Sequence, residues 1–322
     1  MSMDRRLAAL VLLAAAVPAL AAPRPLAGQT ADTAPSTDPD PAAQDAPVEC
    51  VDGKPITLGA EDVPWADTAA ALTRLSREGG GDDPDGASPD RLLARGDSAF
   101  AVGHHTLAYT AYSTAARAAP GYEASWKSAR AAIDVGQGLD DDPEPWYRLG
   151  ESWGREAAER EPDAPEGHFM LAQALGLIAL DAGVRERVQM STEIRSEALA
   201  ALEADSSYAG GWHILGRWHA GVRELSGPAR FFARTFLGGE VFSEASWDEA
   251  ERHLRRAGEL EPDRIVHPLE LARVYLETDR PEEARSALER ALTLTPMDGQ
   301  DCAYLAEARR LLEEELGGGP DS

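Results

Sequence analysis

The sequence lacks the residue patterns that build most catalytic and cofactor sites. It contains no Gly-rich phosphate loop after a strand, no Cys-x-x-Cys, no His-Glu-x-x-His and no nucleophile elbow. The histidines that could be candidates for metal ligands are His104, His105, His213 and His219. Adjacent histidines point in different directions on a helix, and six residues do not bring His213 and His219 onto one face. We therefore expect no enzyme, no cofactor and no metal site.

Basic residues are scarce. The chain has 31 Lys and Arg against 56 Asp and Glu, and its formal net charge is -25. Such a charge repels the phosphate backbone of nucleic acids and the surface of an anionic membrane. We expect no nucleic-acid partner, and most of the charge is expected to serve solubility.

The first residues read as an export signal over 1–22. Arg5 and Arg6 supply a positive start, Leu7 to Val17 an apolar run too short to span a bilayer, and Ala19 to Ala21 a small-residue cleavage site. The mature protein is then periplasmic or extracellular, with no stable membrane insertion after signal cleavage. An uncleaved anchor is the alternative.

Residues 23–88 are rich in Pro, Ala, Asp and Thr and have few bulky apolar side chains. Such a segment cannot bury enough surface to offset its ordering entropy, so we expect a disordered linker with one short helix at 66–77. The linker carries Cys50, and the other cysteine is Cys302. An oxidising compartment permits a disulfide between them, and two free or buried thiols are the alternative.

A repeated spacing is what the sequence does contain. Ala250, Leu254, Ala257 and Pro262 are spaced by four, three and five residues, and the same spacings recur 34 residues later, the tetratricopeptide length. Positions four and three apart share a helical face, where a small residue admits a neighbouring helix and the proline ends the turn. Related spacings begin near residues 108, 150, 194 and 284.

These repeats predict an all-α fold over 89–316: a tetratricopeptide-like right-handed superhelix, or α-solenoid, of about five helix pairs. Residues 301–316 form a polar C-terminal capping helix, which a solenoid needs over its last apolar face. Residues 317–322 are expected to be a disordered tail.

One segment interrupts the repeats between Glu224 and Phe242. At helical spacing it places Phe232 and Phe236 on one side and Arg230 and Arg234 on another. An inserted amphipathic helix that packs its aromatic side chains on the solenoid is one interpretation. Contact with a partner or with lipid is the other.

The order of these pieces resembles the regulator of microtubule dynamics family. The resemblance rests on residues 211–218 (GWHILGRW), the Arg/Phe-rich interruption, and residues 250–262 with Arg255, Arg256 and Ala257. It extends over about 90–316. It implies a tetratricopeptide-like domain with a long interruption inside one repeat, and a non-enzymatic scaffold associated with microtubules. An exported chain would not meet microtubules, so we expect the fold to carry over better than the cytoskeletal role.

The expected function is therefore the binding of a protein or peptide on the concave face formed by the first helix of each pair. Helical phase directs Gln173, His213, Arg217 and Arg273 toward that face. Basic residues there suggest an acidic peptide or a carboxylate terminus as the ligand. The alternative function is an envelope structural or lipid-associated protein that uses residues 230–237.

Overall fold

The computed structural model describes residues 50, 51, 54, 55, 88–101, 103–139, 141–225, 227, 231, 233, 235 and 240–317. The predicted signal at 1–22, most of the linker with its helix at 66–77, and residues 318–322 lie outside the described residues. The predicted second surface, Arg230, Phe232, Arg234 and Phe236, lies outside them as well.

The described part of the chain is almost entirely helical. The elements are β1 (Cys50–Val51), β2 (Lys54–Pro55), α3 (Pro89–Ala101), α4 (His105–Ala118), α5 (Tyr122–Gln137), α6 (Glu144–Arg160), α7 (Pro165–Ile178), α8 (Val184–Ala204), α9 (Ala209–Glu224), the 3-10 helix η4 (Glu240–Glu244), α11 (Trp247–Leu260), α12 (Val266–Glu277), α13 (Pro281–Leu292) and α14 (Gly299–Glu314). Within the described residues, no helix is both long and apolar enough to cross a membrane.

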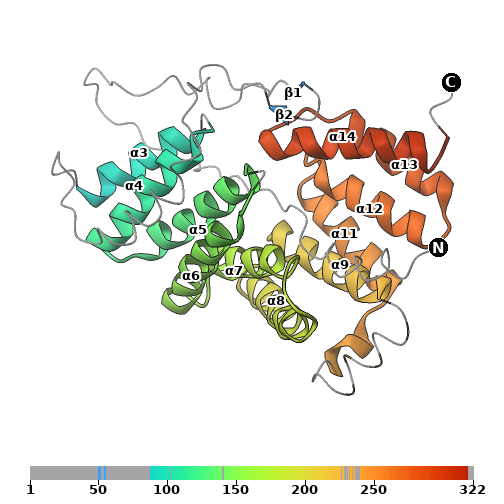
Figure 1. The fold of residues 1–322 in the computed structure, drawn as a ribbon, viewed down its shortest axis with the longest axis horizontal. Helices are drawn as coiled ribbons and strands as arrows, with labels where there is room; N and C mark the ends of the chain where they lie inside the picture. The colour runs from blue at the N-terminus through green and yellow to red at the C-terminus, as the bar shows by residue number, and fades with distance from the viewer. Residues whose placement is uncertain are drawn as a thin grey trace.

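The helices form five consecutive pairs: α3–α4, α5–α6, α7–α8, α9–α11 and α12–α13. Helix α14 follows as a single helix against α13 and α12. In Figure 1 the pairs follow one another along an arc, from α3 and α4 at one end to α13 and α14 at the other. The all-α solenoid of five pairs with a terminal helix is confirmed.

The small residues of the repeat lie where the helices approach one another most closely. Ala250, Leu254 and Ala257 have no exposed surface, and neither do their counterparts 34 residues later. On α6, a Cβ at Gly154 would lie 2.7 Å from the backbone nitrogen of Leu171 on α7. The four-three spacing therefore sets helix contacts, as a packing pattern should.

A short hairpin and a disulfide lie at the C-terminal end of the arc. Strands β1 and β2 pair antiparallel, with Cys50 opposite Pro55. Both strands contact α14, and Cys50 forms a disulfide with the buried Cys302 on that helix, with the two Cα atoms 5.4 Å apart. This hairpin stands in the segment whose composition predicts a linker, and no pattern in that segment predicted it.

Candidate functional site

The four residues predicted to line the concave face lie on the first helices of three consecutive pairs. Gln173 is on α7, His213 and Arg217 are on α9, and Arg273 is on α12. Gln173, His213 and Arg217 are at most 4% exposed, and the Arg273 side chain is 18% exposed. We call the side of these first helices the inner face. The predicted residues are thus largely covered, not open to solvent.

The structure brings Arg217 and Arg273 together through a carboxylate that the repeat spacing did not identify. Glu270 on α12 forms an ion pair with Arg217 and a second one, at 3.1 Å, with Arg273. Arg273 also pairs with Glu307 of α14 at 3.4 Å. Both arginines therefore hold Glu270 as an internal counter-ion, which offsets part of their positive charge.

His213 lies beside His267 of α12, and their Nδ1 atoms are 3.0 Å apart. Burial lowers the pKa of His213 well below its usual value, and the neighbouring His267 lowers it further. Burial also lowers the pKa of His267. Two neutral rings can share this contact when one Nδ1 donates and the other accepts. The pair therefore links α9 to α12 without a net charge.

Helix α5 adds Arg130 and Asp134 to the inner face. Burial raises the pKa of Asp134 to about 7, Arg130 opposes this rise, and the charges of Asp298 and Arg264 also act on the carboxyl. Asp298 is the N-cap of α14 and Arg264 precedes α12. Charges from the C-terminal pairs thus reach a carboxyl on the second pair.

Sequence reasoning missed Arg130, although the signal was there. Gln173 follows Ala172, Arg217 follows Gly216 and Arg273 follows Ala272, and each of these small residues holds the same repeat position. Arg130 follows Ala129 at that same position. In contrast, Arg264, Glu270 and His267 follow no such rule, and no signal in the sequence identified them.

Three inner-face arginines have guanidinium N–H groups without a hydrogen-bond acceptor among the described residues. These groups are Nε of Arg130, Nε and Nη2 of Arg217, and Nε of Arg264. All three side chains are buried. A buried donor without an acceptor costs about 1–3 kcal/mol, and an acceptor-rich ligand would relieve that cost. The inner face therefore offers hydrogen-bond donors that could bind a ligand rich in acceptors.

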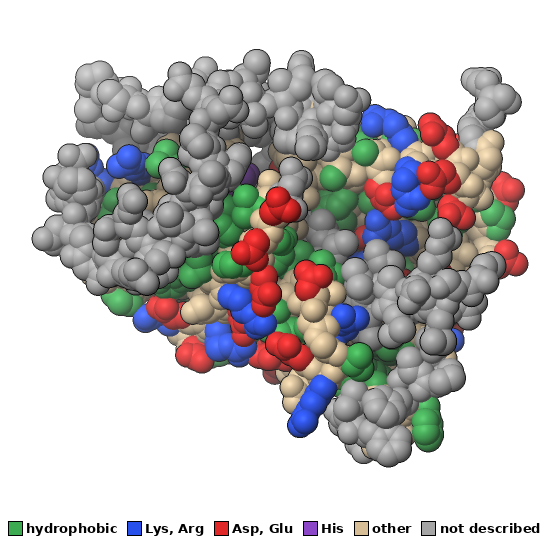
Figure 2. All heavy atoms as spheres, in the orientation of Figure 1, with side chains coloured by type: hydrophobic (Ala, Val, Ile, Leu, Met, Phe, Trp, Pro, Cys, Tyr) green, Lys and Arg blue, Asp and Glu red, His purple; other side chains and the backbone are tan. Residues whose placement is uncertain are grey.

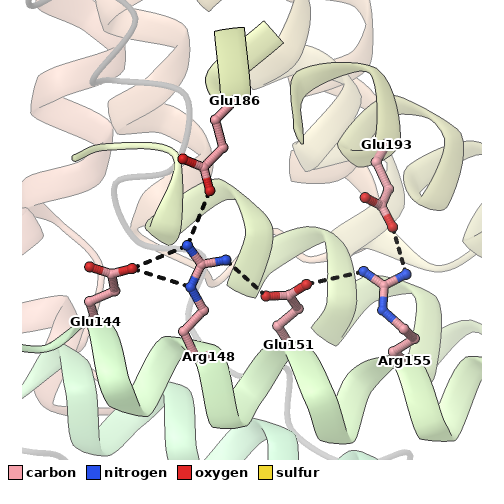
Figure 3. A network of polar contacts seen from close by, with 6 residues as sticks. All are labelled: Glu144, Arg148, Glu151, Arg155, Glu186 and Glu193. Atoms are coloured by element: carbon pink, nitrogen blue, oxygen red, sulfur yellow. Dashed lines mark hydrogen bonds and ion pairs between the residues drawn. The ribbon is translucent and has the colours of Figure 1, made fainter. Parts of the chain in front are cut away.

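The surface between α6 and α8 has a different character, because the charges there are paired. Glu151 of α6 bridges Arg148 and Arg155, and these arginines reach Glu186 and Glu193 of α8 (Figure 3). Acidic and basic side chains are interleaved over this part of the surface in Figure 2. Such an arrangement holds two helices together and leaves little unpaired charge to attract a ligand.

Elsewhere, one group of side chains could hold a metal ion among the described residues: His219, Glu249 and His253, between α9 and α11. In the interruption, Phe231 is 56% exposed and Ala233 is buried. No catalytic arrangement of nucleophile, base and orienting group is apparent in the described part of the chain.

Helix pairs in tandem, small residues at the crossings and a polar inner face define a tetratricopeptide-like α-solenoid. The model of the family described as regulator of microtubule dynamics protein 1-3 matches residues 92–317. The chain belongs to this family, and the resemblance inferred from the sequence is confirmed.

Solved structures also match the chain, among them a tetratricopeptide protein of similar fold. One is TTC0263, a thermophilic protein of Thermus thermophilus, at 23% identity and a TM-score of 0.51, with 69% of this chain and 98% of that chain covered. Another is MamA, at 16% identity and a TM-score of 0.40, with 62% and 92% covered. The sequence has no match among curated proteins.

Proposed function

We propose that this protein is a non-enzymatic scaffold that binds an extended segment of another protein on the inner face of its solenoid. Tetratricopeptide-like folds generally bind proteins or peptides, which supports the class of partner. The observation that carries the proposal is the set of unpaired, buried guanidinium donors on Arg130, Arg217 and Arg264. They come from α5, from α9 and from the turn before α12.

The ligand is expected to be rich in acceptors. Main-chain carbonyls of an extended peptide, an acidic side chain or a terminal carboxylate would each accept from these N–H groups. Arg217 shows how one guanidinium could hold an internal ion pair and a ligand at the same time. Its Nη1 pairs with Glu270, while its buried Nε and Nη2 have no acceptor among the described residues, and a ligand would reach them once the side chains that cover them move. Ligand binding therefore need not break the internal ion pair.

The partner is expected outside the cytoplasm, since residues 1–22 have the features of an export signal. The cytoskeletal role suggested by the family is then replaced by binding in the envelope or medium. Intact mass of the native protein tests this point. Removal of about 22 residues supports export, and a retained Met1 in a cytosolic fraction contradicts it.

Site-specific photo-crosslinking tests the binding face. A photoreactive residue is placed at Arg273, on the inner face, and in a second variant at Leu199, which is exposed on α8. We expect a discrete polypeptide adduct from position 273 and none from position 199, with both variants folded by circular dichroism. Equal adducts from both positions would argue against an inner-face site.

The arginine chemistry is tested with Arg217→Lys. Lysine keeps the charge that pairs with Glu270 but removes the Nε and Nη2 donors. Affinity for a peptide of the crosslinked partner should fall about tenfold, which corresponds to one hydrogen bond of about 1.4 kcal/mol. The matched control is Arg155→Lys between α6 and α8, which should leave affinity unchanged. An unchanged affinity in the folded Arg217→Lys variant would contradict the proposal.

The second candidate function is an envelope structural or lipid-associated protein. The exposed Phe231 favours it, because a large apolar side chain in an interruption suits insertion at a membrane surface. Flotation with neutral phospholipid vesicles tests it, since the acidic chain is repelled by anionic ones. Recovery that disappears in Phe231→Ser supports lipid contact. Absence of the wild-type protein from the vesicle fraction rules it out.

A further inference from the structure

Three side chains with metal-ligating atoms converge inside the interrupted fourth pair. His219 lies in the last turns of α9, and Glu249 and His253 lie in the first turns of α11. One ligand atom from each residue lies within 4.8 Å of the others. Glu249 and His253 are four residues apart, so they share one face of α11. That face is directed at α9.

The two imidazoles are enclosed by other rings. Their centroids are 5.1 Å apart, Trp212 lies 5.4 Å from His253, and Trp218 lies 5.0 Å from His219. His219 is 6% exposed and His253 is 5% exposed. Burial among aromatic rings restrains the imidazoles, and a restrained pair loses little side-chain entropy when it coordinates an ion.

Each histidine offers one ring nitrogen to this cluster. Nδ1 of His253 is buried and has no hydrogen-bond partner among the described residues.

A cation already occupies part of this position. Nη2 of Arg252 contacts the carboxylate of Glu249 and lies 3.0 Å from Nε2 of His253. The Arg252 side chain is 59% exposed and belongs to the surface, so it can turn away at small cost. The guanidinium thus marks where positive charge is stabilised, and a metal ion would replace it.

We propose that His219, Glu249 and His253 form a binding site for a divalent first-row metal ion, with Zn²⁺ the best fit. Two imidazole nitrogens and one carboxylate oxygen are a ligand set that zinc accepts, with water in the fourth position. One bond opposes binding: the backbone N–H of Ser246 donates to Nδ1 of His219 at 3.3 Å. Coordination by His219 breaks this long bond or requires the other tautomer.

The position of the site suggests what the metal does. Helix α9 ends at Glu224 and α11 begins at Trp247, so this pair lacks the short connection of the others. His219 lies before the interruption, and Glu249 and His253 lie after it. A metal bound to all three would hold the two ends of the interruption together, as a structural zinc ion does in small domains.

Co²⁺ and Zn²⁺ binding to the full chain tests the proposal. In a large excess of Mg²⁺, which occupies weak carboxylate sites, we expect one Co²⁺ per chain with the visible absorption of a tetrahedral ion, displaced by Zn²⁺. Glu249→Gln and His253→Gln should each weaken binding by more than the about 10-fold to 100-fold that loss of an outer-shell contact costs. Arg252→Ala should strengthen it, since the competing cation is gone.

The controls separate this site from general cation binding. His168 forms another histidine–carboxylate contact, with Glu197 at 2.6 Å, but has no second histidine beside it. His168→Asn should therefore bind Co²⁺ like the wild type. Should His253→Gln fail to fold, Glu249→Gln and Arg252→Ala decide the matter, because Glu249 is partly exposed and Arg252 is a surface residue. The absence of tetrahedral Co²⁺ absorption in the wild type, or unchanged affinity in a folded Glu249→Gln variant, would overturn the proposal.

Discussion

At the scale of single residues, Gly154 sets the distance between α6 and α7. A Cβ there would meet the backbone of Leu171, 2.7 Å from its nitrogen, and backbone cannot move aside as a side chain can. Gly258 on α11 is a matched comparison, because a Cβ there would lie 3.6 Å from the Cβ of His267, an ordinary contact. The same chemical change thus meets two different surroundings.

We predict opposite results for Gly154→Ala and Gly258→Ala. Alanine favours a helix by about 1 kcal/mol over glycine, so Gly258→Ala should raise the free energy of unfolding by up to that amount. Gly154→Ala should lower it by about 1–3 kcal/mol, since overpacking exceeds the helix preference. Urea unfolding followed by circular dichroism measures both. Equal stabilisation by the two changes would mean that α6 and α7 are less closely packed than described.

At the scale of elements, the charges between α6 and α8 connect the second helices of successive pairs. Arg148 and Arg155 are seven residues apart, as are Glu186 and Glu193, so each pair of contacts repeats after two helical turns (Figure 3). The side chains are partly exposed, so salt screens their attraction. The network adds alignment between neighbouring pairs and only a modest stability.

We predict that Glu193→Lys lowers the free energy of unfolding by about 0.5–1 kcal/mol at low salt, because it faces Arg155 with a like charge. Adding Arg155→Glu should restore most of the loss by reversing the pair. At about 1 M NaCl, where the Debye length is about 3 Å, the two variants should converge with the wild type. Failure of the second change to restore stability at low salt would show that Arg155 and Glu193 do not pair.

At the scale of the whole molecule, Asp134 on α5 is a carboxyl influenced by charges that lie far along the chain. Its pKa is raised to about 7 by burial, with Arg130, Asp298 and Arg264 acting on it, and His105 lies 3.7 Å away. The unfolded chain releases this proton near pH 4. Between about pH 4 and 7 only the folded form holds the proton, so its contribution to stability is lost as pH rises through this window.

We predict that Asp134→Asn reduces the decrease in the free energy of unfolding between about pH 4 and 7. Relative to the wild type, the variant should gain stability from about pH 4 to 7, by at most about 1.4 kcal/mol per pH unit. His105 acts in the opposite direction, since burial lowers its pKa to about 4 and its neutral form adds stability as pH rises to about 6.5. Comparing urea unfolding of the two proteins at each pH isolates Asp134. A parallel pH dependence would mean that this carboxyl is not buried.

The disulfide is the other whole-molecule feature, because Cys50 and Cys302 are 252 residues apart. We predict no free thiols in denatured, non-reduced protein from its native compartment. Reduction should lower the free energy of unfolding by about 1–3 kcal/mol, because the disulfide restricts the unfolded chain. Cys302→Ser should reproduce the effect of reduction. Two free thiols per chain in the native protein would contradict the pairing.

The sequence by itself determined the helices, their pairing and the place of the interruption. These features follow from local spacing, because small residues four and three apart mark a helix contact wherever they recur. Repeat position also predicted Gln173, Arg217 and Arg273 as residues of the concave face, and Arg130 holds the same repeat position.

Only the tertiary structure decided which polar side chains lie in contact. Glu270 lies between Arg217 and Arg273, His213 meets His267, and His219 meets His253, although the partners of His213 and His219 are 54 and 34 residues along the chain. The physical reason is that a carboxylate or an imidazole chooses its partner by distance in space. That distance depends on how whole helix pairs stack, which the spacing within one helix does not contain.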